Sequence, residues 1–412
     1  MVDEHMSGEE RRTKGEGRRG KRILFLSYWS LREPLTASAI FPYLRILSQR
    51  EDVERIHLVT METTQDFLPV VELNIPKVVH TAIEPRLRWS FLLSKVELHV
   101  RAVVRMVRMV RRDGIGLIIA KASMAGAIAH FVHRFTGVPY YVESYEPHSV
   151  YMAECGVWST GGARYRFAHY MEQVQLRHAK HIITVTHNHR DDLIAEGYAP
   201  EMVKVIPSIT DLQVFAHDPK DRLVRRTELG IPATSTVGIY VGKFGGLSFD
   251  EEAFTIFARS FHHFPDMHII VLSPMDPDAI RAKAKAAGVP LERFHVLLAR
   301  HVDVPSYLSA ADMAFSTIKP SPIKRYQCPI KNGEYWASGL PILMTDGIAD
   351  DHKLLRQGIG GSVFGHGLEG LDDAFRTIRG ILADKGHARK VVELAKQYKS
   401  VDIARRVYAE II

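Results

Sequence analysis

Apolar runs of strand length alternate with helical segments along the first half of this chain, and this alternation constrains the fold most. Runs rich in β-branched and aromatic residues occur at residues 22–28, 55–61, 78–84, 115–123, 138–144 and 181–186. Segments with helical spacing lie between them, at residues 36–49, 91–112, 125–135 and 165–177. Strands that alternate with helices predict a parallel sheet covered by helices on both faces.

The same alternation resumes after a polar, proline-containing link at residues 205–221. Strand-like runs follow at residues 236–244, 267–273, 293–299, 313–317, 341–345 and 360–364, with helical segments at residues 250–264, 277–288 and 304–311. We therefore predict an α/β protein with two doubly wound, Rossmann-like domains that face a central cleft. Ligands in such folds bind beyond the carboxyl ends of the strands, so the cleft is the expected site.

The predicted organisation has four parts. Residues 1–22 have mixed charge and no apolar run, which indicates a disordered basic tail and not a secretory signal. The two domains span residues 23–207 and 208–398, and residues 399–412 form a C-terminal helix that is expected to pack back on the N-terminal domain.

The composition of the 412 residues argues against several classes of protein. Hydrophobic residues make up 46% and charged residues 25%, as in a soluble globular protein, and no apolar run reaches the roughly 20 residues that span a bilayer. Cys155 and Cys328 are far apart, which suits a reducing cytosol better than a disulfide framework. The net charge of +7 suggests a polyanion or an anionic membrane as partner, but the sequence has no recognisable nucleic-acid-binding motif, so we expect no nucleic acid.

Two segments have the residue types of a metal site. Residues 187–193, HNHRDDL, are dense in histidine and aspartate, and Asp276 and Asp278 form a D-x-D pair. We interpret the first segment as a solvated helix start and the second as a helix cap, so no metal is expected. No strict G-x-G-x-x-G follows a strand, which argues against a nicotinamide cofactor.

Residues 321–343 contain the most distinctive pattern. Pro329 stands at the expected first position of a short helix, whose free amides and dipole form an anion site suited to phosphate. Lys331 adds a positive charge, and Glu334 lies three residues on along the same face. A carboxylate beside a phosphate is explained if it accepts hydrogen bonds from a ribose diol, which predicts a nucleotide. The alternative is a surface helix with an intrahelical Lys–Glu pair.

A glycine-rich turn forms the second element. Gly242, Gly245 and Gly246 permit close approach of backbone amides to a ligand, and Lys243 follows the strand that opens the second domain. A lysine there is suited to neutralise a diphosphate leaving group. The alternative is an ordinary glycine turn with a solvated lysine.

These segments resemble a known family. The stretches VGKFGG, DVPSYLSAADMAFS and CPIKNGEYWASGLPIL resemble the nucleotide-sugar half of the GT-B glycosyltransferases, family 4 in particular. Residues 25–47 and 137–152 are similar to the acceptor half of the bacterial surface-polysaccharide members. The resemblance implies the GT-B fold, with the acceptor on the N-terminal domain. It also implies retaining, metal-independent transfer from a nucleotide-diphosphate sugar, without a cofactor.

The resemblance also implies roles for single residues. The ribose-binding glutamate of the family falls on Glu334, and its phosphate-binding basic residue falls on Lys243. Tyr326 stands where the family has the first of two paired glutamates. The family's second lysine is absent after the glycine turn, and Lys331 or Lys324 is expected to supply its charge. The other expected donor-binding residues are Gly242, Gly245, Gly246, Pro329 and Ile330.

On the acceptor side, Glu143, Glu146 and His148 follow the strand at residues 138–144. His148 is expected to accept the proton of the acceptor hydroxyl or to position the sugar, unless it only caps a loop. The expected catalytic residues are Lys243, Lys331 and His148.

Arg101, Arg105, Arg108 and Arg112 form one stripe of a long helix. Apolar residues form the other side, and Trp89 and Phe91 lead into it; the apolar set is Leu93, Val96, Val100, Val103, Val104 and Val107. The stripe faces either an anionic membrane or solvent, with the apolar side on the sheet. The resemblance favours the membrane, because many relatives use lipid-linked acceptors made at the inner leaflet.

The leading hypothesis is a hexosyltransferase-like enzyme that acts on a lipid-linked or polysaccharide acceptor in the cytoplasm, peripherally at the inner face of the cell membrane. One alternative is a nucleotide-sugar 2-epimerase of the same fold. Another is a non-catalytic protein that binds a nucleotide or a polyanion.

Overall fold

The computed structural model describes residues 20–32, 34–62, 73–86, 91–246 and 248–412. The predicted tail lies outside the described residues up to residue 19, and the first strand begins at Lys21, within its predicted span. Trp89 also lies outside the described residues.

Seven parallel strands form the N-terminal sheet, in the order β3-β2-β1-β4-β5-β6-β7. They are β1 (Lys21–Ser27), β2 (Val53–Met61), β3 (Val78–Ile83), β4 (Leu117–Lys121), β5 (Tyr140–Ser144), β6 (His181–Thr184) and β7 (Val203–Val205). Neighbouring side chains of β1 enter two separate cores, since Leu24 and Leu26 pack on one face of the sheet and Ile23 and Phe25 on the other. A sheet buried on both faces explains why these strands are continuous apolar runs.

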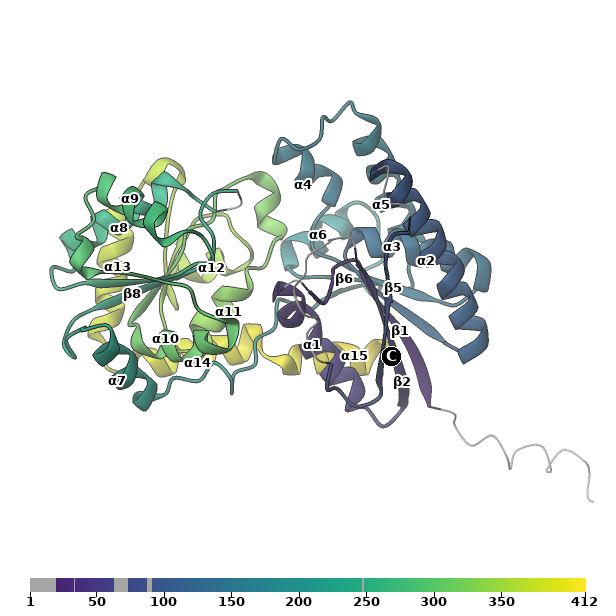
Figure 1. The fold of residues 1–412 in the computed structure, drawn as a ribbon, viewed down its shortest axis with the longest axis horizontal. Coiled ribbons are helices and arrows are strands. Elements are labelled where there is room, and N and C mark those ends of the chain that lie inside the picture. Colours follow the sequence, from purple (N-terminus) through teal and green to yellow (C-terminus); the bar gives the residue numbers. More distant parts are fainter. Residues whose placement is uncertain (1–19, 33, 63–72, 87–90, 247) are drawn as a thin grey trace, which may run out of the picture.

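Six parallel strands form the second sheet, in the order β10-β9-β8-β11-β12-β13. They are β8 (Val237–Val241), β9 (His268–Leu272), β10 (Phe294–Leu297), β11 (Met313–Ser316), β12 (Ile342–Thr345) and β13 (Gly361–Phe364). The two sheets lie side by side, each between layers of helices (Figure 1). The prediction of two doubly wound, Rossmann-like domains is confirmed.

Helices connect the strands of both sheets. The N-terminal domain has α1 (Pro34–Ser48), α2 (Phe91–Asp113), α3 (Ser123–Thr136), α4 (His148–Glu154), α5 (Ala163–His178) and α6 (His187–Ala195). The C-terminal domain has α7 (Pro219–Glu228), α8 (Glu251–His263), α9 (Pro277–Ala286), α10 (Val304–Ala310), α11 (Ile330–Ala337), α12 (Asp351–Leu355), α13 (Leu371–Ala383) and α14 (His387–Lys399). Among the described helices, none combines the length and hydropathy that a membrane span requires.

The last helix, α15 (Val401–Ile411), lies against the N-terminal domain, although α14 belongs to the C-terminal one (Figure 1). Ala404, Tyr408 and Ile411 enter the core that β1 and α1 form. The end of the chain therefore ties the two domains together.

Helix α2 packs differently from the prediction. Leu98, Ala102 and Met106 face the sheet, whereas Val96 and Val100 of the predicted packing side are 54% and 59% exposed. Val103 and Val107 are only partly buried. The helix contains two apolar stripes, and its periodicity alone did not distinguish the one that meets the core.

Candidate active site

The glycine turn follows the carboxyl end of β8, and its glycines have the positive φ angles that glycine permits. Gly242, Gly245 and Gly246 have φ angles of 142°, 78° and 60°, in the region that side chains with a Cβ rarely adopt. Tyr240 fixes the turn, because its hydroxyl donates to the carbonyl of Lys243 at 2.6 Å. The Lys243 side chain is exposed at this edge of the sheet.

Helix α11 brings Lys331 beside the glycine turn. The Lys331 Nζ lies 3.5 Å from the carbonyl oxygen of Val241 and 4.8 Å from the centre of the Tyr240 ring. A Cβ added to Gly242 would stand 3.7 Å from the same Nζ. Burial lowers the pKa of Lys331 to about 8, although Glu334 opposes the shift. Two segments 90 residues apart thus place a half-buried cation at the end of β8.

Glu334 lies one turn further along α11 and is only 6% exposed. Its Oε1 is 3.4 Å from Nε2 of His301, whose pKa is raised by the hydrogen bond to this carboxylate. His301 belongs to a short 3-10 helix, η2 (His301–Asp303), that follows β10. His301 was not among the site residues predicted from the sequence. Its position just after a strand of the same sheet was the signal that pointed to it.

A buried polar network holds α11 in place. Asn332 accepts a hydrogen bond from the Ser316 hydroxyl at 2.8 Å and donates to Asp351 at 2.9 Å. Lys399 pairs with the same aspartate at 2.7 Å and lies 3.2 Å from the sulfur of Cys328. The groups of this network are buried and each has a defined hydrogen-bond partner. The network therefore fixes the orientation of α11, the helix that carries Lys331 and Glu334.

The helix itself begins one residue later than predicted. Ile330 is its first residue and Pro329 is the N-cap residue, with φ of −63°. Gly333 explains how closely this helix packs, because a Cβ there would lie 2.3 Å from the Thr210 hydroxyl oxygen.

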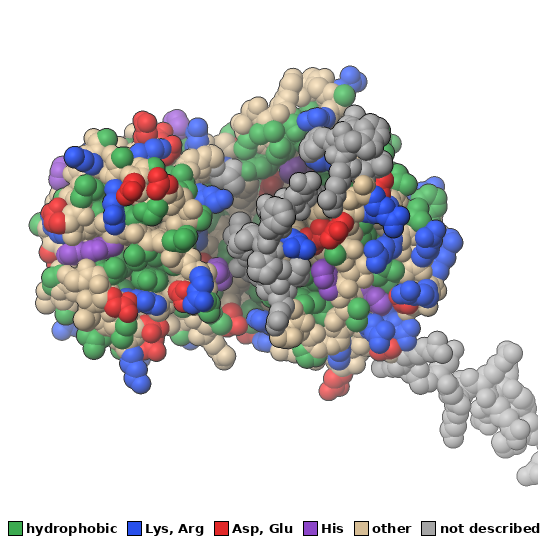
Figure 2. Space-filling view, viewed as in Figure 1, with side chains coloured by type: hydrophobic (Ala, Val, Ile, Leu, Met, Phe, Trp, Pro, Cys, Tyr) green, Lys and Arg blue, Asp and Glu red, His purple; other side chains and the backbone are tan. Residues whose placement is uncertain are grey.

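Glu146 and Lys324 approach one another from different domains. Lys324 lies in η3 (Pro322–Tyr326) and is 3% exposed. Burial raises the pKa of Glu146 to about 7, and the charge of Lys324 partly opposes this. Burial also lowers the pKa of Lys324, which donates to the Gln327 side chain at 3.0 Å. The space-filling view shows the surface hollowed along the line between the two domains (Figure 2).

His148 is the first residue of α4, close to Glu146 in the chain. Its ring meets that of Trp158 edge-on, with 5.6 Å between centres. Burial lowers its pKa, so the imidazole is neutral at pH 7.

Glu143 lies at the carboxyl end of β5, as expected, but its side chain is buried. It pairs with Lys121 in the core of the N-terminal domain, accepts a hydrogen bond from the Tyr408 hydroxyl at 2.7 Å and is only 4% exposed. The carboxylate thus joins β5 to α15, and the expectation of an acceptor-side position is corrected.

Tyr326, expected to bind the donor, contacts the N-terminal domain. Its hydroxyl bonds to Asp192 of α6, and its ring lies 4.8 Å from that of His189. The segment with the residue types of a metal site, residues 187–193, begins α6. Asp350 accepts hydrogen bonds from the amides of its first two residues, His187 and Asn188, at 2.6 and 3.2 Å. These contacts occupy the helix start with a carboxylate from the opposite domain.

The aspartates at 276 and 278 form a helix cap. Asp276 accepts a hydrogen bond from the amide of Asp278 at the start of α9. Among the described residues, no group of three or more histidine, cysteine, aspartate or glutamate side chains is arranged to hold a metal ion.

Comparisons with known proteins agree with this architecture. Residues 48–208 match the family model described as the glycosyl transferase 4-like domain. No curated protein has a sequence that matches the chain.

Three solved structures share the fold over nearly the whole chain. HepE from Anabaena, in complex with UDP-glucose, is 18% identical, with a TM-score of 0.68 and coverage of 94% of this chain and 98% of its own. The lipopolysaccharide outer core galactosyltransferase WaaB, in its apo form, is 11% identical, with a TM-score of 0.66 and coverage of 95% and 98%. A UDP-N-acetylglucosamine 2-epimerase is 13% identical, with a TM-score of 0.63 and coverage of 95% of both chains. The chain therefore has the two-domain GT-B fold, and its residues 48–208 match the model of the glycosyl transferase 4-like domain.

Proposed function

We propose that the protein transfers a sugar, with retention, from a nucleotide-diphosphate donor to a lipid-linked or polysaccharide acceptor. The observation that carries the proposal is the meeting of the β8 glycine turn, Lys331 and Glu334 at the carboxyl edge of the second sheet. This edge is where nucleotides bind in doubly wound folds.

The donor diphosphate is bound by positive charge and by backbone amides. Lys331 is suited to this role because burial removes part of the hydration that stabilises its charged form. A bound diphosphate stabilises that charge in place of water. Lys243 and the amides near Gly245 and Gly246 act on the departing diphosphate. Charge stabilisation of this kind is often the largest single contribution to catalysis. Glu334 accepts hydrogen bonds from the ribose hydroxyls, which replace its contact with His301.

The acceptor hydroxyl approaches from the N-terminal domain, beside His148 and Glu146. The neutral imidazole of His148 accepts the hydroxyl proton as the new glycosidic bond forms and the bond to the diphosphate breaks. Attack from the front side retains the configuration of the sugar and needs no nucleophile from the enzyme.

The acceptor is proposed to be lipid-linked or a polysaccharide, at the inner face of the cell membrane. The galactosyltransferase that shares this fold acts on lipopolysaccharide, and α2 carries a basic stripe, as membrane-bound helices often do. Catalysis is proposed to need no metal.

Binding and product analysis test the proposal. Calorimetry with nucleoside diphosphates and nucleotide sugars should identify a nucleotide that the protein binds tightly. Addition of a metal chelator should leave the turnover unchanged. Lys243→Ala should reduce turnover more than it weakens binding of the nucleoside alone. A protein that binds no nucleotide, or one whose activity is lost in chelator and restored by manganese, would contradict the proposal.

The 2-epimerase that shares the fold supports a second candidate function. An epimerase converts the nucleotide sugar without any acceptor. Chromatography of the sugar after incubation with donor alone separates the two, since an epimerase yields a new nucleotide sugar under those conditions.

A further inference from the structure

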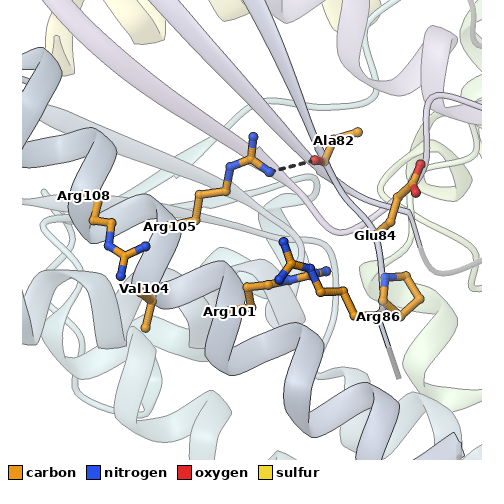
Figure 3. Close-up of a pocket in the computed structure, with 8 residues that line it drawn as sticks. Ala82, Glu84, Arg86, Arg101, Val104, Arg105 and Arg108 are labelled. Carbon is orange, nitrogen blue, oxygen red and sulfur yellow. Dashed lines mark hydrogen bonds between the residues drawn. The ribbon is translucent and has the colours of Figure 1, made fainter. Parts of the chain in front are cut away.

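A groove of about 880 Å³ lies between α2 and the segment that follows β3, on the N-terminal domain (Figure 3). Its lining includes Glu84, Arg86, Arg101, Val104, Arg105 and Arg108. None of these residues belongs to the candidate active site. Arg112 of the predicted stripe is not in the lining and instead pairs with its neighbour Asp113 at 2.7 Å.

Positive charge dominates the groove. Arg101 lies 3.3 Å from Glu97, and Arg105 donates to the carbonyl of Ala82 at 3.4 Å. Arg86 reaches from the strand end toward Arg101 (Figure 3). Guanidinium groups repel one another at close range, so an anion that joins several of them lowers the energy of the cluster. Their planar donors match the oxygens of phosphate.

An exposed apolar stripe borders the groove. Leu93, Val96, Val100 and Val104 are 45%, 54%, 59% and 40% exposed. Their spacing of three, four and four residues places them on one face of α2, and Val104 also lines the groove. The basic side chains over this part of the molecule appear in Figure 2. An apolar stripe of this kind, edged by charge, marks an interaction surface.

We propose that α2 and its groove dock on a bilayer that contains anionic phospholipid. Arg86, Arg101, Arg105 and Arg108 bind lipid phosphates, while the apolar stripe enters the boundary between headgroups and acyl chains. A soluble anion would use the arginines but leave the leucine and valines in water, so the stripe favours a lipid surface. The proposal rests on the membrane location in the proposed function, and names the surface and the lipid chemistry responsible for it.

Co-sedimentation of the full chain with vesicles tests the proposal. The vesicles contain phosphatidylcholine alone or with phosphatidylglycerol, at low and high salt. One variant combines Arg105→Gln with Arg108→Gln, and its control combines Arg379→Gln with Arg389→Gln, two exposed arginines of α13 and α14.

The second variant combines Val96→Ser with Val100→Ser. Its control combines Leu223→Ser with Val224→Ser, which are 66% and 50% exposed on α7. All four positions are exposed, so each variant should keep the fold, and circular dichroism and UDP calorimetry on the same samples verify this.

We expect wild type to bind anionic vesicles and to bind neutral ones weakly. The arginine variant should bind roughly 25-fold less at low salt, since each of its two arginines contributes about five-fold near a charged surface. The valine variant should mainly lose the binding that remains at high salt. Salt screens the attraction between charges but not the insertion of apolar side chains into the bilayer. Both controls should bind like wild type.

Three results would overturn the proposal: no vesicle binding by wild type, equal binding by wild type and both variants, or thermal stabilisation by inorganic diphosphate that wild type shows and the arginine variant lacks, without vesicle binding. The last would assign the groove to a soluble anion. The UDP titrations are independent, so a protein that binds vesicles as expected but no nucleotide would refute the proposed function and leave this surface intact.

Discussion

The carboxyl edges of the two sheets both contain a lysine and a buried glutamate, but the pairs are arranged differently. In the N-terminal domain, Lys121 and Glu143 contact one another and are closed off by Tyr408. In the C-terminal domain, Lys331 lies against the glycine turn and Glu334 faces His301, whose side chain is 51% exposed. A buried charge whose partners lie inside the core has no side open to a ligand, and removing one partner destabilises the fold. A buried charge whose partner reaches solvent is accessible to a ligand.

The largest expected effect is on stability, from a change in the buried Lys121–Glu143 pair. Lys121→Met leaves the Glu143 carboxylate buried without its cation, which should lower the free energy of unfolding by about 3–5 kcal/mol in urea titrations. Combining it with Glu143→Leu should restore much of the loss. A single variant as stable as wild type would show that this pair does not stabilise the N-terminal domain.

Glu334→Ala should act on binding instead. Loss of hydrogen bonds from ribose to a charged acceptor should weaken nucleoside diphosphate binding by about 1.5–3 kcal/mol in calorimetry. Glu143→Gln is the matched control and should leave the affinity of the folded protein unchanged. Equal affinities for wild type and Glu334→Ala would remove the distinction between the two glutamates.

The pKa of Lys331 predicts a pH dependence of the same site. A bound diphosphate favours the protonated form of Lys331 and raises its pKa above the value of about 8 in the ligand-free protein. Binding above pH 7 is therefore accompanied by proton uptake. Affinity should be highest below pH 8 and should fall as the pH rises through 8 toward the pKa of the complex. Titrations from pH 7 to 9 measure this. Lys331→Arg should flatten the profile, and a wild-type profile as flat as that of the variant would contradict the role.

The smallest effect is expected from Glu146. Its pKa of about 7 means that it ionises across neutral pH, and a negative carboxylate beside the acceptor should raise turnover as the pH increases through 7. Glu146→Gln should abolish this step in the pH profile of kcat with little change in stability. If the step persists in the variant, another group titrates there.

Local pattern predicted much of the fold and part of the site. Alternating runs predicted both sheets, because a strand buried on both faces must be apolar throughout. The β7 strand, Val203–Val205, was missed, since three residues are too few to show a period. The positive φ angles of Gly242, Gly245 and Gly246 agree with the predicted turn at a strand end. The three-residue spacing of Lys331 and Glu334 correctly predicted that both lie on one helix.

By itself, then, the sequence determined the two layered domains, the glycine turn and the helix that carries Lys331 and Glu334, because each depends on residues close together in the chain. Only the tertiary structure placed His301 beside Glu334, put Tyr326 against Asp192 across the domains, and enclosed Glu143 beneath Tyr408. The last two contacts join residues 134 and 265 positions apart. It also decided which apolar stripe of α2 meets the core. Local periodicity carries no information about partners so distant, since packing of whole elements selects them.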